Sequence, residues 1–273
     1  MSYSTIMVTV DPDHPDAAHL RLAAELAERF DSRLIGVCAA DIQPMYFMEG
    51  AAAEDFIEKD RAALKAKIDA AEQGFRRAAQ ARSRPAEWRG ALALPADNAA
   101  LQARAADLIV AAAPRERIDP LRQVDPGALV LRAGRPVLVI PPQAASLSLK
   151  SVVVGWKDTR EARRAVADAL PLLHKAEQVV VVEIVEAQSD RDAAKARVED
   201  VAAWLTRRGV PTASIATRQL IGVPGQLDVI AQDEGADVIV AGAYGHTRFT
   251  EWVFGGVTRD LLRNGKRCAL LSH

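Results

Sequence analysis

Three glycines near the C-terminus, Gly242, Gly245 and Gly255, lie where a backbone could hold phosphate oxygens. The first two follow an apolar strand predicted over 236–241, and Gly255 with Gly256 opens a predicted helix. Glycines let the backbone approach an anion closely, and the free amides and dipole of a helix N-terminus favour negative charge. A tight strand-to-helix turn without a ligand is the alternative explanation of these glycines.

Other polar side chains are predicted at the same end of the sheet, because ligands of open parallel sheets bind at the carboxyl ends of the strands. Lys157 would contact a phosphate as a point charge or lie in solvent, and His246 would donate to a phosphate oxygen or lie in an exposed loop. The Thr258 hydroxyl lies in the first turn of the last helix, within reach of a phosphate. The candidate binding residues are Gly155, Trp156, Lys157, Asp158, Gly242, Gly245, His246, Gly255, Gly256 and Thr258.

No other pattern in the chain indicates catalysis or metal binding. His14 and His19 are five residues apart and the other histidines are isolated, so no metal-ligand spacing occurs. The chain has no G-x-S-x-G elbow and no Walker A motif. Since no catalytic base can be named, we expect a protein that is not an enzyme, and slow ATP hydrolysis lacks support.

Composition limits the class of protein. The chain has 273 residues, 49% of them apolar, and a net charge of −1, which gives no indication of nucleic-acid binding. Charges interrupt every apolar run before membrane-spanning length, and the N-terminus enters a strand at once, so we expect a cytoplasmic protein with no signal peptide and no membrane partner. Cys38 and Cys268 lie in apolar strand-like runs and are predicted to be buried free thiols.

The second half of the chain repeats the pattern of the first. Each half alternates strands and helices as βαβαβαβαβ, and apolar strands separated by helices indicate a parallel sheet covered on both faces. A linker rich in proline and small residues covers Pro141–Leu149. We therefore predict an α/β protein of two tandem five-stranded parallel-sheet domains, residues 1–145 and 146–273.

A long helix over about 54–82 distinguishes the first half from the second. Its apolar side chains recur at helical spacing, which favours core packing, with a partner surface as the alternative. The stripe is formed by Phe56, Leu64, Ile68, Ala71, Phe75 and Ala78.

The pattern G-x2-G-x9-G of Gly242, Gly245 and Gly255 at the end of a fourth strand, in a chain of two such repeats, resembles the universal stress protein family. The resemblance implies an open five-stranded parallel sheet of the adenine-nucleotide-binding superfamily. Some members of that family bind ATP and others do not. Their ATP site combines an aspartate at the end of the first strand, the three glycines, and a serine or threonine directly after the third glycine.

Each half of this chain departs from that ATP-binding pattern in a different way. In the second half, Gly256 replaces the hydroxyl residue and Lys157 stands at the aspartate position. In the first half Asp11 is at the expected position but the glycine loop is lost; the aligned positions hold Ala112, Arg115, Val124 and Asp125. The resemblance thus implies a degenerate site in domain 1–145 and ATP, or another adenine nucleotide, in domain 146–273 only. Asp11 is then expected to be a turn and helix-cap residue.

Two functions follow from the resemblance. The first is a tandem universal stress protein, a stress-response regulator whose C-terminal domain binds an adenine nucleotide. The alternative is a structural or interaction protein that binds no nucleotide and acts through domain pairing and dimerisation. Because domains of this family pair through their last strands, the resemblance implies an internal pseudo-dimer of the two halves, with a homodimer as a further expectation.

Overall fold

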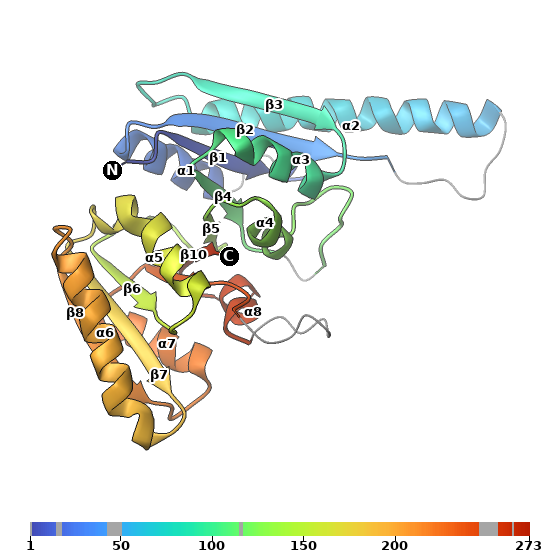
Figure 1. Cartoon of the computed structure of the whole chain (residues 1–273). Helices are drawn as coiled ribbons and strands as arrows, with labels where there is room; N and C mark the ends of the chain where they lie inside the picture. Colours follow the sequence, from blue (N-terminus) through green and yellow to red (C-terminus); the bar gives the residue numbers. More distant parts are fainter. Residues whose placement is uncertain (1, 15–17, 43–50, 115–116, 246–255, 264) are drawn as a thin grey trace. The chain divides into compact units, whose positions relative to one another are not determined.

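The computed structural model describes residues 2–14, 18–42, 51–114, 117–245, 256–263 and 265–273 (Figure 1). The chain forms two compact units, Tyr3–Ala133 and a second one that contains Gly134–His273. The expected boundary between the sequence repeats, near Ala145, lies later in the chain, because the last strand of the first repeat belongs to the second compact unit.

The first unit is a parallel α/β layer. Its elements are β1 (Thr5–Val10), α1 (Ala18–Arg29), β2 (Arg33–Ala40), α2 (Ala51–Ala78), β3 (Ala86–Leu92), α3 (Pro95–Gln102), the 3-10 turn Ala103–Ala105, β4 (Leu108–Ala112) and α4 (Pro126–Arg132). The strands lie in the order β3-β2-β1-β4, and every pair is parallel. Helices α1 and α2 contact each other, as do α3 and α4, and α3 lies on the opposite side of the strands from α2 (Figure 1).

Apolar burial explains these elements. Ile6, Met7 and Val8 of β1 are fully buried, as expected for a strand covered on both faces. The apolar stripe of α2 is buried at Leu64, Ile68, Ala71 and Phe75, which confirms core packing there, whereas Phe56 is 46% exposed. The prediction of core packing is therefore wrong for Phe56, which lies near the N-terminal end of the helix.

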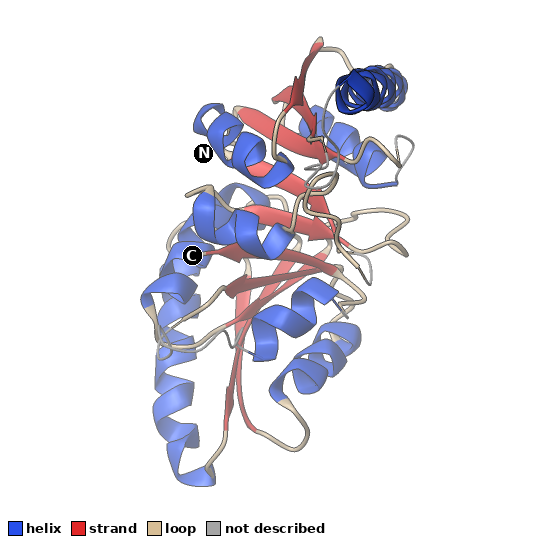
Figure 2. Cartoon of the chain, turned by 90° about the vertical axis from the view of Figure 1, so that its right-hand side faces the viewer, coloured by secondary structure: helices blue, strands red, loops and turns tan. Residues whose placement is uncertain are grey.

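The second unit contains six strands in the order β5-β10-β9-β6-β7-β8, with helices on both sides of the strands (Figure 2). Its elements are β5 (Val137–Ile140), β6 (Ser151–Gly155), α5 (Arg160–Leu173), β7 (Gln178–Val185), the 3-10 turn Gln188–Asp190, α6 (Arg191–Thr206), β8 (Thr212–Arg218), α7 (Val223–Asp233), β9 (Val238–Gly242), α8 (Gly256–Arg263) and β10 (Cys268–Ser272). Strands β6 to β10 pair in parallel, and β5 joins β10 antiparallel with Leu138 opposite Leu270.

The predicted α/β class, with mainly parallel strands and helices on both faces, is confirmed by this arrangement. The predicted free thiols are confirmed as well, since Cys38 in β2 and Cys268 in β10 are both buried and unbridged. In the second unit α5 packs on β9 and β10, and α6 packs on β7 and β8. The strand order reverses between β6 and β9, and this reversal is where ligands of such sheets bind.

Candidate functional site

The glycine loop of the second unit begins where β9 meets the first turn of α5. Gly155 at the end of β6 lies opposite Ala241 of β9. A Cβ atom on Gly242 would lie 2.5 Å from the Ala162 backbone nitrogen and 2.6 Å from the Glu161 carbonyl carbon. Only glycine therefore fits at 242 without a backbone shift, and helix packing alone accounts for it.

Glu161 places a carboxylate against this loop. Its side chain is 1% exposed, and its Oε1 accepts a hydrogen bond from the Arg160 Nε at 2.5 Å. Its Oε2 is buried and has no hydrogen-bond partner among the described residues. A Cβ atom on Gly245 would lie 3.1 Å from that oxygen and 3.4 Å from the Thr159 Oγ1. The position where a phosphate would meet the loop is thus next to a buried acid.

The ionised form of Glu161 is favoured in spite of its burial. Desolvation raises the pKa of this carboxyl, but the hydrogen bond from the Arg160 side chain, together with the helix backbone and the nearby Thr159 hydroxyl, outweighs it, so the net shift of the pKa is downward. Thr159, the N-cap of α5, also accepts a hydrogen bond from the Ala162 backbone nitrogen. At neutral pH the residue beside Gly245 is therefore an anion.

The Thr258 hydroxyl is occupied by the protein itself. Thr258 is 4% exposed, and its Oγ1 accepts from the Tyr244 backbone nitrogen at 3.4 Å. Tyr244 has a φ of 57°, a left-handed conformation that is uncommon for a bulky residue. Its ring packs edge-on against His273 at 6.3 Å between centroids. Thr258 therefore supports the turn between the glycines.

The remaining predicted residues of this site have different surroundings. Lys157 is exposed and has no ion pair among the described residues, while Asp158 pairs with the Arg163 Nη2 at 2.5 Å. Trp156 lines a groove between α5 and α6, and its backbone nitrogen donates to the Val182 carbonyl. Gly256 is exposed at the start of α8. His246 and Gly255 lie outside the described residues.

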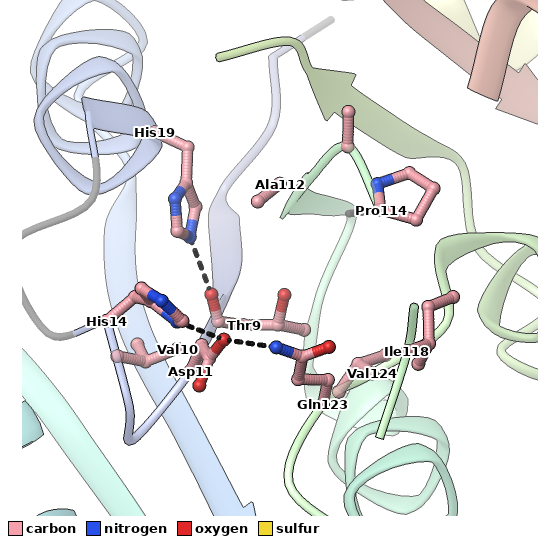
Figure 3. Close-up of a pocket in the computed structure, with 11 residues that line it drawn as sticks. Thr9, Val10, Asp11, His14, His19, Ala112, Pro114, Ile118, Gln123 and Val124 are labelled. Atoms are coloured by element: carbon pink, nitrogen blue, oxygen red, sulfur yellow. Dashed lines mark hydrogen bonds and ion pairs between the residues drawn. The ribbon is translucent and has the colours of Figure 1, made fainter. Parts of the chain in front are cut away.

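In the first unit, Asp11 stands at the position that corresponds to Lys157. Its carboxylate is hydrogen-bonded to other groups of the protein (Figure 3). The Asp11 Oδ2 lies 2.8 Å from the His14 Nδ1 and accepts from the Gln123 Nε2 at 3.0 Å. The Asp11 Oδ1 accepts from the Asp13 backbone nitrogen at 2.9 Å. Asp11 is thus the turn residue that the sequence indicated; α1 begins later, at Ala18.

The cavity beside Asp11 is small. Its volume is about 70 Å³, well below the roughly 300–1,000 Å³ of typical small-molecule sites. The buried side chain of His19 lines this cavity. Its Nε2 forms a hydrogen bond of 2.8 Å with the Thr9 carbonyl. Burial lowers the pKa of His19, although the Thr9 hydrogen bond opposes the shift, so this histidine is neutral and structural.

The described part of the chain contains neither a metal cluster nor a membrane-spanning helix. No group of three or more histidine, cysteine, aspartate or glutamate side chains there could hold a metal ion. No described helix is both long and apolar enough to cross a membrane.

Comparison with known structures defines the class of fold, a doubly wound α/β layer repeated along the chain. A universal stress protein from Archaeoglobus fulgidus is 11% identical, with a TM-score of 0.68 over 98% of this chain and 95% of that one. A functionally unknown protein from Pseudomonas aeruginosa is 17% identical, with a TM-score of 0.60 over 99% of this chain and 92% of that one. No protein-family model and no curated protein matches the sequence. The chain has the fold of the universal stress proteins.

Two residues that lie at the predicted sites, Glu161 and Gln123, were not predicted from the sequence. Glu161 shares the spacing of Ala165 and Ala169 on the buried side of α5, so an acid on that apolar stripe was a readable signal. Gln123 had no comparable signal, because its contact with Asp11 spans 112 residues of sequence.

Proposed function

We propose that this chain is a cytoplasmic stress-response regulator of the universal stress protein type that works through contacts with other molecules and without ATP. The observation that supports this most directly is the buried Glu161 carboxylate beside Gly245. The first unit supports it too, since Asp11 has its hydrogen bonds satisfied within the protein. The proposal contains no catalytic step.

The magnitude of the repulsion favours this function over ATP binding. Two like charges about 4 Å apart repel by about 4 kcal/mol at an effective dielectric constant of about 20. A hydrogen bond to a charged group contributes about 1.5–3 kcal/mol. Because Arg160 pairs with Glu161, the net repulsion is smaller than this value, and the Glu161 carboxylate offsets at most one or two of the amide contacts that a phosphate would gain at the loop.

ATP binding in the C-terminal domain is the second candidate. It is favoured by the spacing of Gly242 and Gly245 and by the exposed cation Lys157 near the end of β6. It requires Glu161 to turn away or to bind a proton, because two anions would otherwise share the loop.

Isothermal titration calorimetry of the full chain with ATP and ADP separates the two functions. Any copurified nucleotide is removed first. We expect no heat of binding at millimolar nucleotide. Micromolar binding that Gly245→Asp abolishes would overturn the proposal and establish ATP binding at the loop.

Self-association forms the other part of the proposal. The pairing of β5 with β10 joins the closing strands of the two repeats and supports an intrachain pseudo-dimer. A homodimer is the further expectation of the family resemblance. Light scattering on the full chain between micromolar and 0.1 mM protein tests it, and a constant monomer mass would remove the homodimer from the proposal.

A further inference from the structure

The second unit contains a groove of about 490 Å³ between α5 and α6. This volume lies within the roughly 300–1,000 Å³ typical of small-molecule sites. The groove exists because α5 packs on β9 and β10 while α6 packs on β7 and β8, which leaves the end of β6 beneath the space between the helices. In the first unit the equivalent helices, α1 and α2, contact each other.

Aromatic and apolar side chains form much of the groove. Trp156 at the end of β6 and Trp204 of α6 line it together with Val166 and Val201. The Trp156 Nε1 is buried and has no hydrogen-bond partner among the described residues. Indole rings favour flat aromatic ligands, and a buried N–H donor favours an acceptor.

Three arginines give the groove donors for an anion. The Arg197 Nε and Nη2 bind the Glu183 carboxylate at 3.1 and 2.5 Å, which holds the guanidinium in place and leaves Nη1 for another acceptor. The pair formed by Arg163 with Asp158 likewise uses the Arg163 Nη2. Arg207 has no carboxylate partner among the described residues.

The carboxylates of the groove pair with two of its three arginines. Three arginines and two aspartates line it, and Glu183 behind Arg197 brings the acidic groups to three, so these groups carry no net charge. Asp158 is engaged by Arg163, and Asp200 is exposed. Asp200 therefore remains as an acceptor for a polar hydrogen of the ligand.

We propose that the groove between α5 and α6 binds a small planar aromatic anion, with the ring against Trp204 and the carboxylate or phosphate on Arg207, one turn further along α6. Trp156 and Asp158, which line the groove, are among the residues that the sequence predicted for the nucleotide site, whereas Trp204 and Arg207 are not. This inference rests on the proposed function and gives the regulator a ligand other than ATP.

Calorimetry of the full chain with 1-naphthoate and with 1-naphthyl phosphate tests the groove, and 1-naphthalenemethanol serves as the uncharged probe. We expect one saturable site for the anions and weaker binding of the alcohol. The tighter anion identifies whether the natural ligand carries a carboxylate or a phosphate. Trp204→Ala should weaken binding by roughly 2- to 10-fold, and Arg207→Ala by about 10-fold.

The controls are Leu220→Ala and Arg263→Ala, which remove an exposed apolar and an exposed basic side chain elsewhere in the unit and should leave affinity unchanged. Arg207 is exposed, so its variant tests the site even if Trp204→Ala fails to fold. Absence of saturable binding, or equal affinity in wild type and Arg207→Ala, would overturn the proposal. ATP binding that Trp204→Ala weakens and Gly245→Asp spares would place a nucleotide in the groove and leave the glycine loop without one.

Discussion

Glu161 places a carboxylate beside the glycine loop. The sequence predicted Gly242 and Gly245 as a phosphate loop, and the structure packs the first against α5 and the second against the Glu161 carboxylate. The spacing of glycines could not reveal this, because a spacing specifies a turn but not what fills it. The apolar stripe of α5 could have shown that Glu161 is buried.

His19 should make stability depend on pH. Its pKa is lowered from 6.5 in the folded protein, so the unfolded chain binds the proton more tightly. The free energy of unfolding therefore falls as pH drops below about 6.5, by at most about 1.4 kcal/mol per pH unit from this group. His19→Gln, which does not titrate, should show a smaller fall between pH 6.5 and 5 in urea titrations.

The control for this prediction is His174→Gln, an exposed histidine at the end of α5. An identical pH dependence in wild type and His19→Gln would show that His19 is not the group responsible.

The two thiols should be almost inert in the native protein. Burial is the main cause that raises the pKa of Cys38 and of Cys268 to about 12, with nearby aspartates adding to the shift. Few thiolates exist at pH 8, and the thiolate is the reactive form. Ellman's reagent should react slowly with native protein and quickly with both thiols in guanidinium chloride. Rapid reaction of either native thiol would contradict their burial.

At the scale of elements, the packing of β9 on α5 can be tested by a matched pair of glycine variants. Gly242→Ala places a Cβ 2.5 Å from the Ala162 backbone nitrogen, whereas no atom of the described residues lies within 4 Å of a Cβ on Gly256. Gly242→Ala should lower the free energy of unfolding by about 1–3 kcal/mol. Gly256→Ala, at a helix start, should change it by less than about 1 kcal/mol. Urea denaturation measures both, and equal effects would contradict the close approach.

The sequence predicted most helices and strands. It did not predict features that depend on contacts between residues far apart in the sequence. Apolar runs predicted the buried strands, and helical spacing predicted the buried part of α2 from Leu64 to Phe75. Exposure of Phe56 was not predicted, because periodicity does not say how far along α2 the neighbouring strands extend. The groove between α5 and α6 was not predicted either, since it depends on helix spacing across the sheet.

At the scale of the whole molecule, β5, the last strand of the first repeat, covers one edge of β10, the last strand of the second repeat. Leu138 of β5 lies opposite Leu270 of β10, and every residue of β10 is buried. A fragment of residues 146–273 lacks β5 and exposes the apolar edge of β10, which is a template for aggregation. It should aggregate more than the full chain, as measured by light scattering in the same buffer. Equal solubility would contradict a protective role of β5.

Repetition in the sequence suggested two equivalent domains, yet the two units use their equivalent positions differently. The position of Asp11 in the first unit is held by Lys157 in the second, and the loop that Gly242 and Gly245 form has no glycine counterpart in the first. In each unit the described part of the site is occupied by the protein's own polar groups, Gln123 and His14 in one and Glu161 in the other.

The most direct measurement of this account is the ATP affinity of Glu161→Gln relative to wild type, by calorimetry of the full chain at pH 7.5. Glutamine keeps the shape of the side chain and removes its charge. We expect no binding by wild type at millimolar ATP and binding by Glu161→Gln with a Kd of about 0.1 mM or tighter. Micromolar binding by wild type, undiminished relative to Glu161→Gln, would contradict it.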